Sequence, residues 1–405
     1  LDKKVKEDYD NLVKSKADLK KQQPGYLQVQ YLYMRSFFPQ NRVAPIAQTA
    51  YTYYRKGAQQ HWQSQNKYMQ GMTALALHRT ADLQTPIDIL RSLKETAIVH
   101  EELGMYWKDT RFGISPFWWS APIETQALLI EAFAEITRDT KTVDGLKTWL
   151  IKNKQTNNWR TTKATAEACY ALLLQGTNWL SSEPVVQIKM GNTVVNSTEQ
   201  KTDAGTGYFT HTIEGAFVQP QMGNITVNVQ QPLNTTTAQP VNHPSWGAVY
   251  WQYFEDMDKI TTAATPLQLS KKLFVEKPGD RGPVLTPLTS SNTLKVGDKI
   301  TVRIELRADR DMEYVHMKDL RASALEPINV LSGYKWQGGM GYYETTRDAA
   351  THFFFNYLRK GTYVFEYSLF VTHAGNYSNG ITTIQSMYAP EFSAHSEGVR
   401  ISIEE

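Results

Sequence analysis

Cysteine is almost absent from this 405-residue chain, because Cys169 is the single one. One cysteine excludes an internal disulfide framework and a cysteine-rich zinc site. No apolar run reaches the roughly 18 residues that a membrane-spanning helix needs, so we predict no membrane span. Neither sign of charge dominates, since 43 Lys and Arg stand against 40 Asp and Glu. Without a concentrated basic face, we expect no nucleic-acid partner.

Signatures of catalysis are also missing. The chain has no Gly-x-Ser-x-Gly elbow and no Gly-x-x-x-x-Gly-Lys phosphate loop. Residues 100–104 (HEELG) begin like a zincin motif but lack its second histidine, and the nine histidines show no metal-ligand spacing. We therefore predict no catalytic residue, no metal site and no cofactor, and so a protein that is not an enzyme.

Three remaining features have plain structural interpretations. The glycine-rich stretch Trp336–Gly341 lies between predicted strands and matches no phosphate-binding pattern, so we expect a flexible loop. Glu255, Asp256 and Asp258 supply too few oxygen ligands at loop spacing for calcium, which favours a solvated acidic turn. Cys169 lies in an Ala/Leu-rich helix, and we expect a buried, inert thiol.

The spacing of apolar residues changes near Glu183. Before this point it is helical. The clearest helix follows Pro122, where one stripe is formed by Ile123, Ala127, Ile130 and Ala134. Further helices are predicted over about 46–55, 68–78 and 87–99, from Val143 to Leu150, and from Thr161 through Ala164, Ala168 and Ala171. The highly charged residues 2–21 predict an exposed helix or a frayed end.

Two segments of the helical part look like copies. Trp119–Thr125 and Trp159–Thr165 align at an offset of 40 residues, and each leads into an Ala/Leu-rich helix. The aromatic residue and the hydroxyl-rich turn suit N-capping by Ser or Thr, and we expect both tryptophans to be structural. A period of about 40 residues fits one helical hairpin with its loops, so the pattern predicts a solenoid or an α/α toroid.

After Glu183 the period is two, which predicts antiparallel strands. Alternating segments are found at 186–190 with a Gly191-Asn192 turn, then at 209–213, 225–229, 300–306, 363–371 and 399–403. A Pro- and Thr-rich stretch, 232–244, separates two β blocks. The fold class is therefore multidomain α plus β: a helical toroid-like array over 1–182, a small β domain over 183–262 and a larger β-sandwich over 263–405.

A toroid also occurs in polysaccharide lyases, so that class stays open as a third possibility. The aromatic side chains that could serve as sugar platforms are Trp107, Trp118 and Trp119. A lyase needs Tyr, His and Arg or Asn to converge on one cleft, and the residues available are His100, Tyr106 and Arg111. Nothing in their spacing demands that arrangement.

Five motifs, in order, resemble bacterial α2-macroglobulins. They are Trp119–Glu131 (WSAPIETQALLIE), Trp159–Leu173 (WRTTKATAEACYALL), Trp246–Asp256 (WGAVYWQYFED), Arg347–Asp348 with Thr351 and Phe353, and Met387–Phe392 (MYAPEF) followed by His395–Ser396. The similar region covers 116–174 and the tail from 246, well over half of the chain. Residues before about 111 match only as a helical array.

The resemblance implies the C-terminal fragment of a large, exported cell-envelope protein, periplasmic or surface-exposed, that entraps proteases. Its expected parts are a thioester-like toroid, a small CUB-like or toroid-flanking β domain and a C-terminal macroglobulin-type sandwich. Partners would be target proteases, through the full-length protein, and other domains upstream of Leu1. In the family, cleavage of a bait region elsewhere in the chain triggers collapse around the protease.

Some family members carry a Cys-Gly-Glu-Gln thioester that bonds the captive protease. Here Cys169 is followed by Tyr170, Ala171 and Leu172, so no thioester can form in this chain. Either the protein lacks one or the motif lies upstream of Leu1; we favour the first, because the helices before Pro116 supply part of the first half of a toroid. The alternative function is a noncatalytic surface module that binds carbohydrate or protein.

Overall fold

The computed structural model describes residues 1–108, 121–175, 184–203, 207–233, 245, 247–280, 282–289, 293–337 and 339–405. These residues form two compact units, Leu1–Lys152 with Trp159–Trp246, and Asn153–Asn158 with Gly247–Glu405. The finer division at 183 and 263 stays a prediction. None of the described helices is long and apolar enough to cross a membrane.

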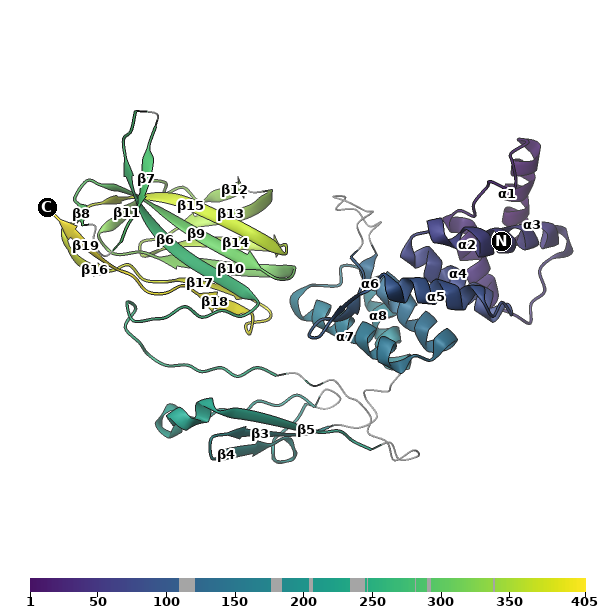
Figure 1. Ribbon diagram of the computed structural model, residues 1–405, viewed down its shortest axis with the longest axis horizontal. Helices are drawn as coiled ribbons and strands as arrows, with labels where there is room; N and C mark the ends of the chain where they lie inside the picture. Colours follow the sequence, from purple (N-terminus) through teal and green to yellow (C-terminus); the bar gives the residue numbers. More distant parts are fainter. Residues whose placement is uncertain are drawn as a thin grey trace. The chain divides into compact units, whose positions relative to one another are not determined.

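The N-terminal part is helical, as predicted (Figure 1). Its α-helices are α1 (Asp2–Lys14), α2 (Tyr26–Ser36), α3 (Gln48–His61), α4 (Lys67–Arg79), α5 (Thr85–Glu95), α6 (Pro122–Ala132), α7 (Thr140–Thr156) and α8 (Thr162–Leu174). The predicted helix over 87–99 is wrong at its end, because α5 stops at Glu95 and β1 (Ile98–His100) pairs with β2 (Gly104–Tyr106). The β-branched pair Ile98 and Val99 favours that hairpin over another helical turn.

Helices α4 and α6 pack tightly in the centre of the helical core. The predicted stripe of α6 is buried at Ile123, Ala127 and Ile130. Gly71 permits the close approach, since a Cβ there would lie 3.0 Å from Cδ2 of Leu129. α1 is not simply an exposed or frayed end, because Val5 is buried in a second cluster with residues of α2 and α3.

The two repeated segments begin their helices differently. Thr161 caps α8, with its Oγ1 accepting a hydrogen bond from the Ala164 backbone N–H at 3.0 Å, as the sequence predicted. α6 has no side-chain cap; it starts after Ala121 with Pro122 in its first turn. The hydroxyl cap predicted there is therefore wrong, since proline needs no N–H partner at this position. Trp119 lies outside the described residues.

A small antiparallel sheet of three strands follows, in the order β4 (Thr193–Asn196), β3 (Val185–Met190) and β5 (Ile225–Gln230). The predicted turn after Met190 is present, with Gly191 at φ +56°. The strand predicted over 209–213 is wrong, because described residues 207–214 belong to no strand. β5 is exposed at every position.

The C-terminal part is built from antiparallel sheets, with one parallel pair between β19 and β8. One sheet has the order β12-β13-β14-β10-β17-β18, a second β11-β15-β9-β6-β7 and a third β16-β19-β8. The strands are β6 (Leu267–Lys277), β7 (Val284–Pro287), β8 (Leu294–Lys295), β9 (Lys299–Ala308), β10 (Met312–Leu320), β11 (Leu325–Pro327), β12 (Gly333–Gln337), β13 (Met340–Thr346), β14 (Ala350–Leu358), β15 (Gly361–Val371), β16 (Gly375–Ser378), β17 (Thr382–Ser386), β18 (Ser393–His395) and β19 (Arg400–Glu404).

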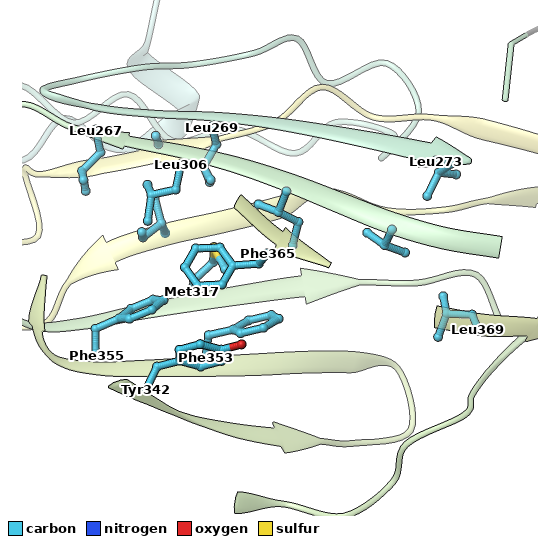
Figure 2. Close-up of a cluster of buried hydrophobic side chains, with 14 of the residues drawn as sticks. Leu267, Leu269, Leu273, Leu306, Met317, Tyr342, Phe353, Phe355, Phe365 and Leu369 are labelled. Carbon is cyan, nitrogen blue, oxygen red and sulfur yellow. The ribbon is translucent and has the colours of Figure 1, made fainter. Parts of the chain in front are cut away.

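The two large sheets bury one shared hydrophobic core. Figure 2 shows leucines of β6, β9 and β15 together with aromatic side chains of β13, β14 and β15. Phe353, Phe355 and Phe365 are each 1% exposed, and Tyr342 lies within 6 Å of all three, 5.3 Å from Phe365 between ring centroids. Apolar side chains alternate inward from both sheets, which is the architecture of a sandwich.

The glycine-rich stretch 336–341 belongs to a hairpin and is not the flexible loop expected. Trp336 on β12 pairs with Gly341 on β13 and Gln337 pairs with Met340, so the stretch contributes residues to both strands. Gly339 adopts φ +78°, a conformation that glycine reaches without strain.

Candidate functional site

Cys169 lies on the exposed surface of α8, so the buried thiol expected from the sequence is wrong. The buried residues of this helix are Ala164, Ala168 and Ala171, spaced four and three apart. Cys169 follows Ala168 and is therefore turned about 100° away from that stripe. Leu172 packs against the helical core in the position where a thioester would require glutamine.

The three candidates for a lyase-like centre have separate structural surroundings where they are described. His100 is exposed, and its Nδ1 accepts backbone hydrogen bonds from Glu102 and Leu103 at 3.2 and 3.1 Å. Tyr106 stacks on Trp149 with 5.9 Å between ring centroids. Arg111 lies outside the described residues. His100 therefore stabilises a turn, and Tyr106 packs against α7.

Of the three tryptophans considered as sugar platforms, only Trp107 lies in the described part of the chain. Trp107 is half-buried against the helical core, and its Nε1 donates to the backbone oxygen of Leu93 at 2.8 Å. That bond fixes the ring to α5, so Trp107 is structural. Trp118 and Trp119 lie outside the described residues.

Two of the three acidic residues in the cluster Glu255, Asp256 and Asp258 pair with basic side chains. Lys259 Nζ lies 2.7 Å from Asp256 Oδ2, and Arg400 Nε lies 2.9 Å from Asp258 Oδ2. Within the described ranges, no group of three or more His, Cys, Asp or Glu side chains could hold a metal ion.

Sequence reasoning missed a polar cluster inside the helical core. Arg79 on α4 reaches Glu131 at 2.7 Å and Glu135 at 2.8 Å, and its guanidinium lies 4.4 Å from the Phe37 ring centroid. On α8, burial raises the pKa of Glu167, and the neighbouring Lys163 offsets part of that effect. The cluster ties α4 to α6 and has the composition of a structural ion network rather than of a substrate site.

A second polar network lies at the core of the sandwich. Lys271 Nζ of β6 is 2.7 Å from Asp319 Oδ1 of β10, with side chains 1% and 0% exposed. The same carboxylate accepts hydrogen bonds from Thr382 Oγ1, at 2.6 Å, and from the Tyr367 hydroxyl. Burial, together with Asp319, raises the pKa of Tyr367 well above its usual value, so the phenol stays a donor.

Asn379 completes this network. It is 1% exposed, its backbone oxygen lies 3.5 Å from Lys271 Nζ, and its Oδ1 accepts from the Ala322 N–H at 3.2 Å. Its Nδ2 is buried and has no hydrogen-bond partner among the described residues. The sequence did hold a signal: in β6 the inward positions read Leu269, Lys271, Leu273, so a lysine occupies an apolar position of the alternation.

The outer face of the six-stranded sheet carries a histidine pair. His316 Nε2 and His352 Nδ1 are 2.9 Å apart, with rings 8° from parallel, and Phe354 stacks on His316. Burial, then His352 and Lys318, lowers the pKa of His316; burial, then Lys318 and Arg347, lowers the pKa of His352. The pair is therefore held neutral near pH 7, one ring donating to the other.

Comparisons with known proteins place the sandwich. Residues 267–391 match the family described as Bacterial Alpha-2-macroglobulin MG10 domain. No curated protein matches the chain. Trypsin-activated α2-macroglobulin from Escherichia coli is 12% identical over 96% of this chain and 25% of its own length, with a TM-score of 0.39. Salmonella α2-macroglobulin reacted with methylamine is 14% identical over 93% of this chain and 24% of its own length, with a TM-score of 0.30.

The native conformation of the E. coli protein is 13% identical over 98% of this chain and 23% of its own length, with a TM-score of 0.30. The chain thus spans about a quarter of the length of these proteins. The family match covers β6 to β17 and reaches the Met387–Phe392 motif. Residues 267–391 therefore belong to the MG10 domain family of bacterial α2-macroglobulins, which confirms the resemblance in the C-terminal part of the chain.

Proposed function

We propose that this chain is part of a bacterial α2-macroglobulin-like, broad-spectrum protease inhibitor that acts by conformational entrapment. The MG10 match over 267–391 carries this proposal. Proteins of this family are protease inhibitors and not enzymes.

The mechanism would be mechanical and not covalent in this chain. The sandwich has a continuous core of large aromatic and aliphatic side chains, and such a core moves as a rigid body. A thioester needs a glutamine three residues after the cysteine to acylate its sulfur. Cys169 is exposed, and Leu172 occupies that position, so no thioester can form at this cysteine. We propose further that α1–α8 form part of an α/α toroid and that the protein resides in the cell envelope.

The test uses the natural full-length protein that contains this chain. It is mixed with a protease, and cleavage of a large protein substrate is compared with cleavage of a small chromogenic peptide. Entrapment should protect the large substrate at near-stoichiometric inhibitor while the small peptide is still cleaved. Because we propose that the whole protein acts without a thioester, prior methylamine treatment should change neither result.

Two outcomes would contradict the proposal. Equal loss of both activities would indicate an inhibitor that blocks the protease active site, and no loss of either would remove the inhibitor function. Residues 1–405 alone serve as the control and should protect nothing, because the bait region that the family uses lies elsewhere.

Exposed aromatic side chains favour a surface-binding module as the second candidate. Tyr334 and Trp336 on β12 are 73% and 80% exposed, on the outer face of the six-stranded sheet. Binding of oligosaccharides or proteins that is lost in the double variant Tyr334→Ser, Trp336→Ser, in a chain with unchanged melting temperature, would support this alternative.

A further inference from the structure

The buried group Lys271, Asp319 and Asn379 combines a nucleophile, a proton acceptor and an amide electrophile. We propose that Lys271 and Asn379 are joined by an intramolecular isopeptide bond, with Asp319 accepting the lysine proton. The bond would link β6 to the segment between β16 and β17, across 108 residues of sequence. Such a bond would belong to the covalent structure of the sandwich and would form whether or not the protein inhibits proteases.

Lys271 is buried in direct contact with a group that can accept its proton. Its side chain is 1% exposed, and Nζ contacts the Asp319 carboxylate at 2.7 Å and the Leu320 backbone oxygen at 2.6 Å. In the proposed step, the Asp319 carboxylate in contact with Nζ accepts a proton from the lysine. The neutral amine that results carries the free electron pair needed for attack on a carbonyl carbon.

Asn379 has the features of the electrophile. The Ala322 N–H donates to Oδ1 at 3.2 Å and polarises the side-chain carbonyl. Nδ2, the nitrogen that would leave, has no hydrogen-bond partner among the described residues although it is buried, an arrangement that asks for an explanation. The alternative electrophile is Asp319 itself, but attack there would consume the one carboxylate in contact with the amine.

The reaction balances without an oxidant or a co-reactant. Asp319 takes one proton from the Lys271 ammonium, and Nζ attacks Cγ of Asn379. A second proton passes from Nζ to Nδ2 as the Cγ–Nδ2 bond breaks. Ammonia then takes the proton from Asp319 and leaves as ammonium, so that an amide bond between Nζ and Cγ remains. Tyr367 and Thr382 hold the carboxylate in place through their hydrogen bonds to Asp319.

Intact-mass spectrometry of the denatured chain tests the proposal. Loss of ammonia lowers the mass by about 17 Da relative to the sequence, and a protease digest should contain one branched peptide joining Lys271 to Asn379. Asp319→Asn should restore the full mass, because no carboxylate remains to accept the proton. Asn379→Asp should lose water instead, by about 18 Da, and give the same cross-linked mass as the wild type.

Lys271→Met is the decisive variant, because Asn379 precedes Gly380 and an asparagine–glycine pair can lose ammonia alone by forming a succinimide. The proposal requires that the deficit disappear in Lys271→Met; a deficit that persists overturns it. A wild-type chain of full mass, or a wild-type deficit of about 18 Da on a Lys271–Asp319 peptide, overturns it as well. The mass of the wild-type chain tests the proposal even if none of the variants folds.

Discussion

At the scale of single residues, periodicity located buried positions better than the chemistry of each residue did. The stripe Ala164, Ala168 and Ala171 is buried as predicted, but Cys169 was assigned to it by residue type and not by angle. Contacts that depend on strand register were beyond the sequence: His316 and His352 lie 36 residues apart and meet only through the pairing of β10 with β14. Local patterns carry no information on such register.

We expect Cys169 to react promptly with a thiol reagent in the native chain. Its side chain is exposed, so the native rate should lie within about a few-fold of the rate in denaturant. Absorbance after addition of a chromogenic disulfide measures both rates, and methylamine should leave the intact mass unchanged. A native rate slower by orders of magnitude would restore the buried thiol, and Cys169→Ser provides the blank.

The histidine pair predicts a loss of stability in weak acid. The folded pKa of each ring is lowered, so its contribution is full above the unfolded pKa of about 6.5 and is lost as the pH falls from there toward the folded pKa. Lys318 on β10 and Arg347 near β14 add like charge. Both rings are partly exposed, so we expect less than about 1 kcal/mol.

The pH effect is measured by urea unfolding at about pH 7.5 and about pH 5, in the wild type and in His316→Gln. Carboxylates elsewhere also titrate in this range, so the difference between the two proteins is the relevant quantity. The variant should lose less stability than the wild type between the two pH values. An identical loss would show that the pair does not contribute.

At the scale of elements, prediction succeeded where one face of a strand or helix is buried. β9 and β15 alternate as predicted because their inward side chains fill the sandwich core. The alternation at 209–213 has the same pattern but belongs to no strand, since a short run needs a partner as well as a period. The buried network around Lys271 cannot be predicted from the sequence, because a single polar residue in an apolar pattern does not indicate which residues it will contact.

Trp159 tests the interpretation of the repeat as helix packing. Its ring is 9% exposed and belongs to the helical core. Trp159→Ala should cost about 3–5 kcal/mol, which is enough to unfold or aggregate a marginal domain. Tyr170→Ala, at a side chain that is 48% exposed on the following helix α8, is the matched control and should change little. Equal melting temperatures for wild type and Trp159→Ala would refute packing as its role.

At the scale of the whole molecule, ordered motifs predicted more than composition or periodicity did. The motifs in the tail predict the family, and the MG10 match at 267–391 includes two of them, Arg347–Phe353 and most of Met387–Phe392. Closure of the helices into a toroid stays a prediction, because a period of about 40 residues specifies the repeating unit but not how many units complete a ring. The domain boundaries depend on the same long-range packing.

Limited proteolysis tests the organisation into separately packed units. We expect cleavage within the Pro- and Thr-rich stretch 232–244, most of which lies outside the described residues, and slower cleavage at 278–283. The second site connects β6 and β7, whose residues 274–277 pair with 284–287. This pairing holds both ends of the connection, so the backbone enters a protease active site less easily and cleavage is slower.

Fragments that contain a complete hydrophobic core should survive the digestion. A piece beginning near Gly247 should persist, because every buried residue of the sandwich core lies between Leu267 and Ile403. A helical piece should persist as well, since its core is complete between Val29 and Ala171 among the described residues. Mass spectrometry of the digest identifies both. Cuts spread evenly over residues 30–175 would contradict a packed helical array, because backbone inside stable helices must unfold before it is cleaved.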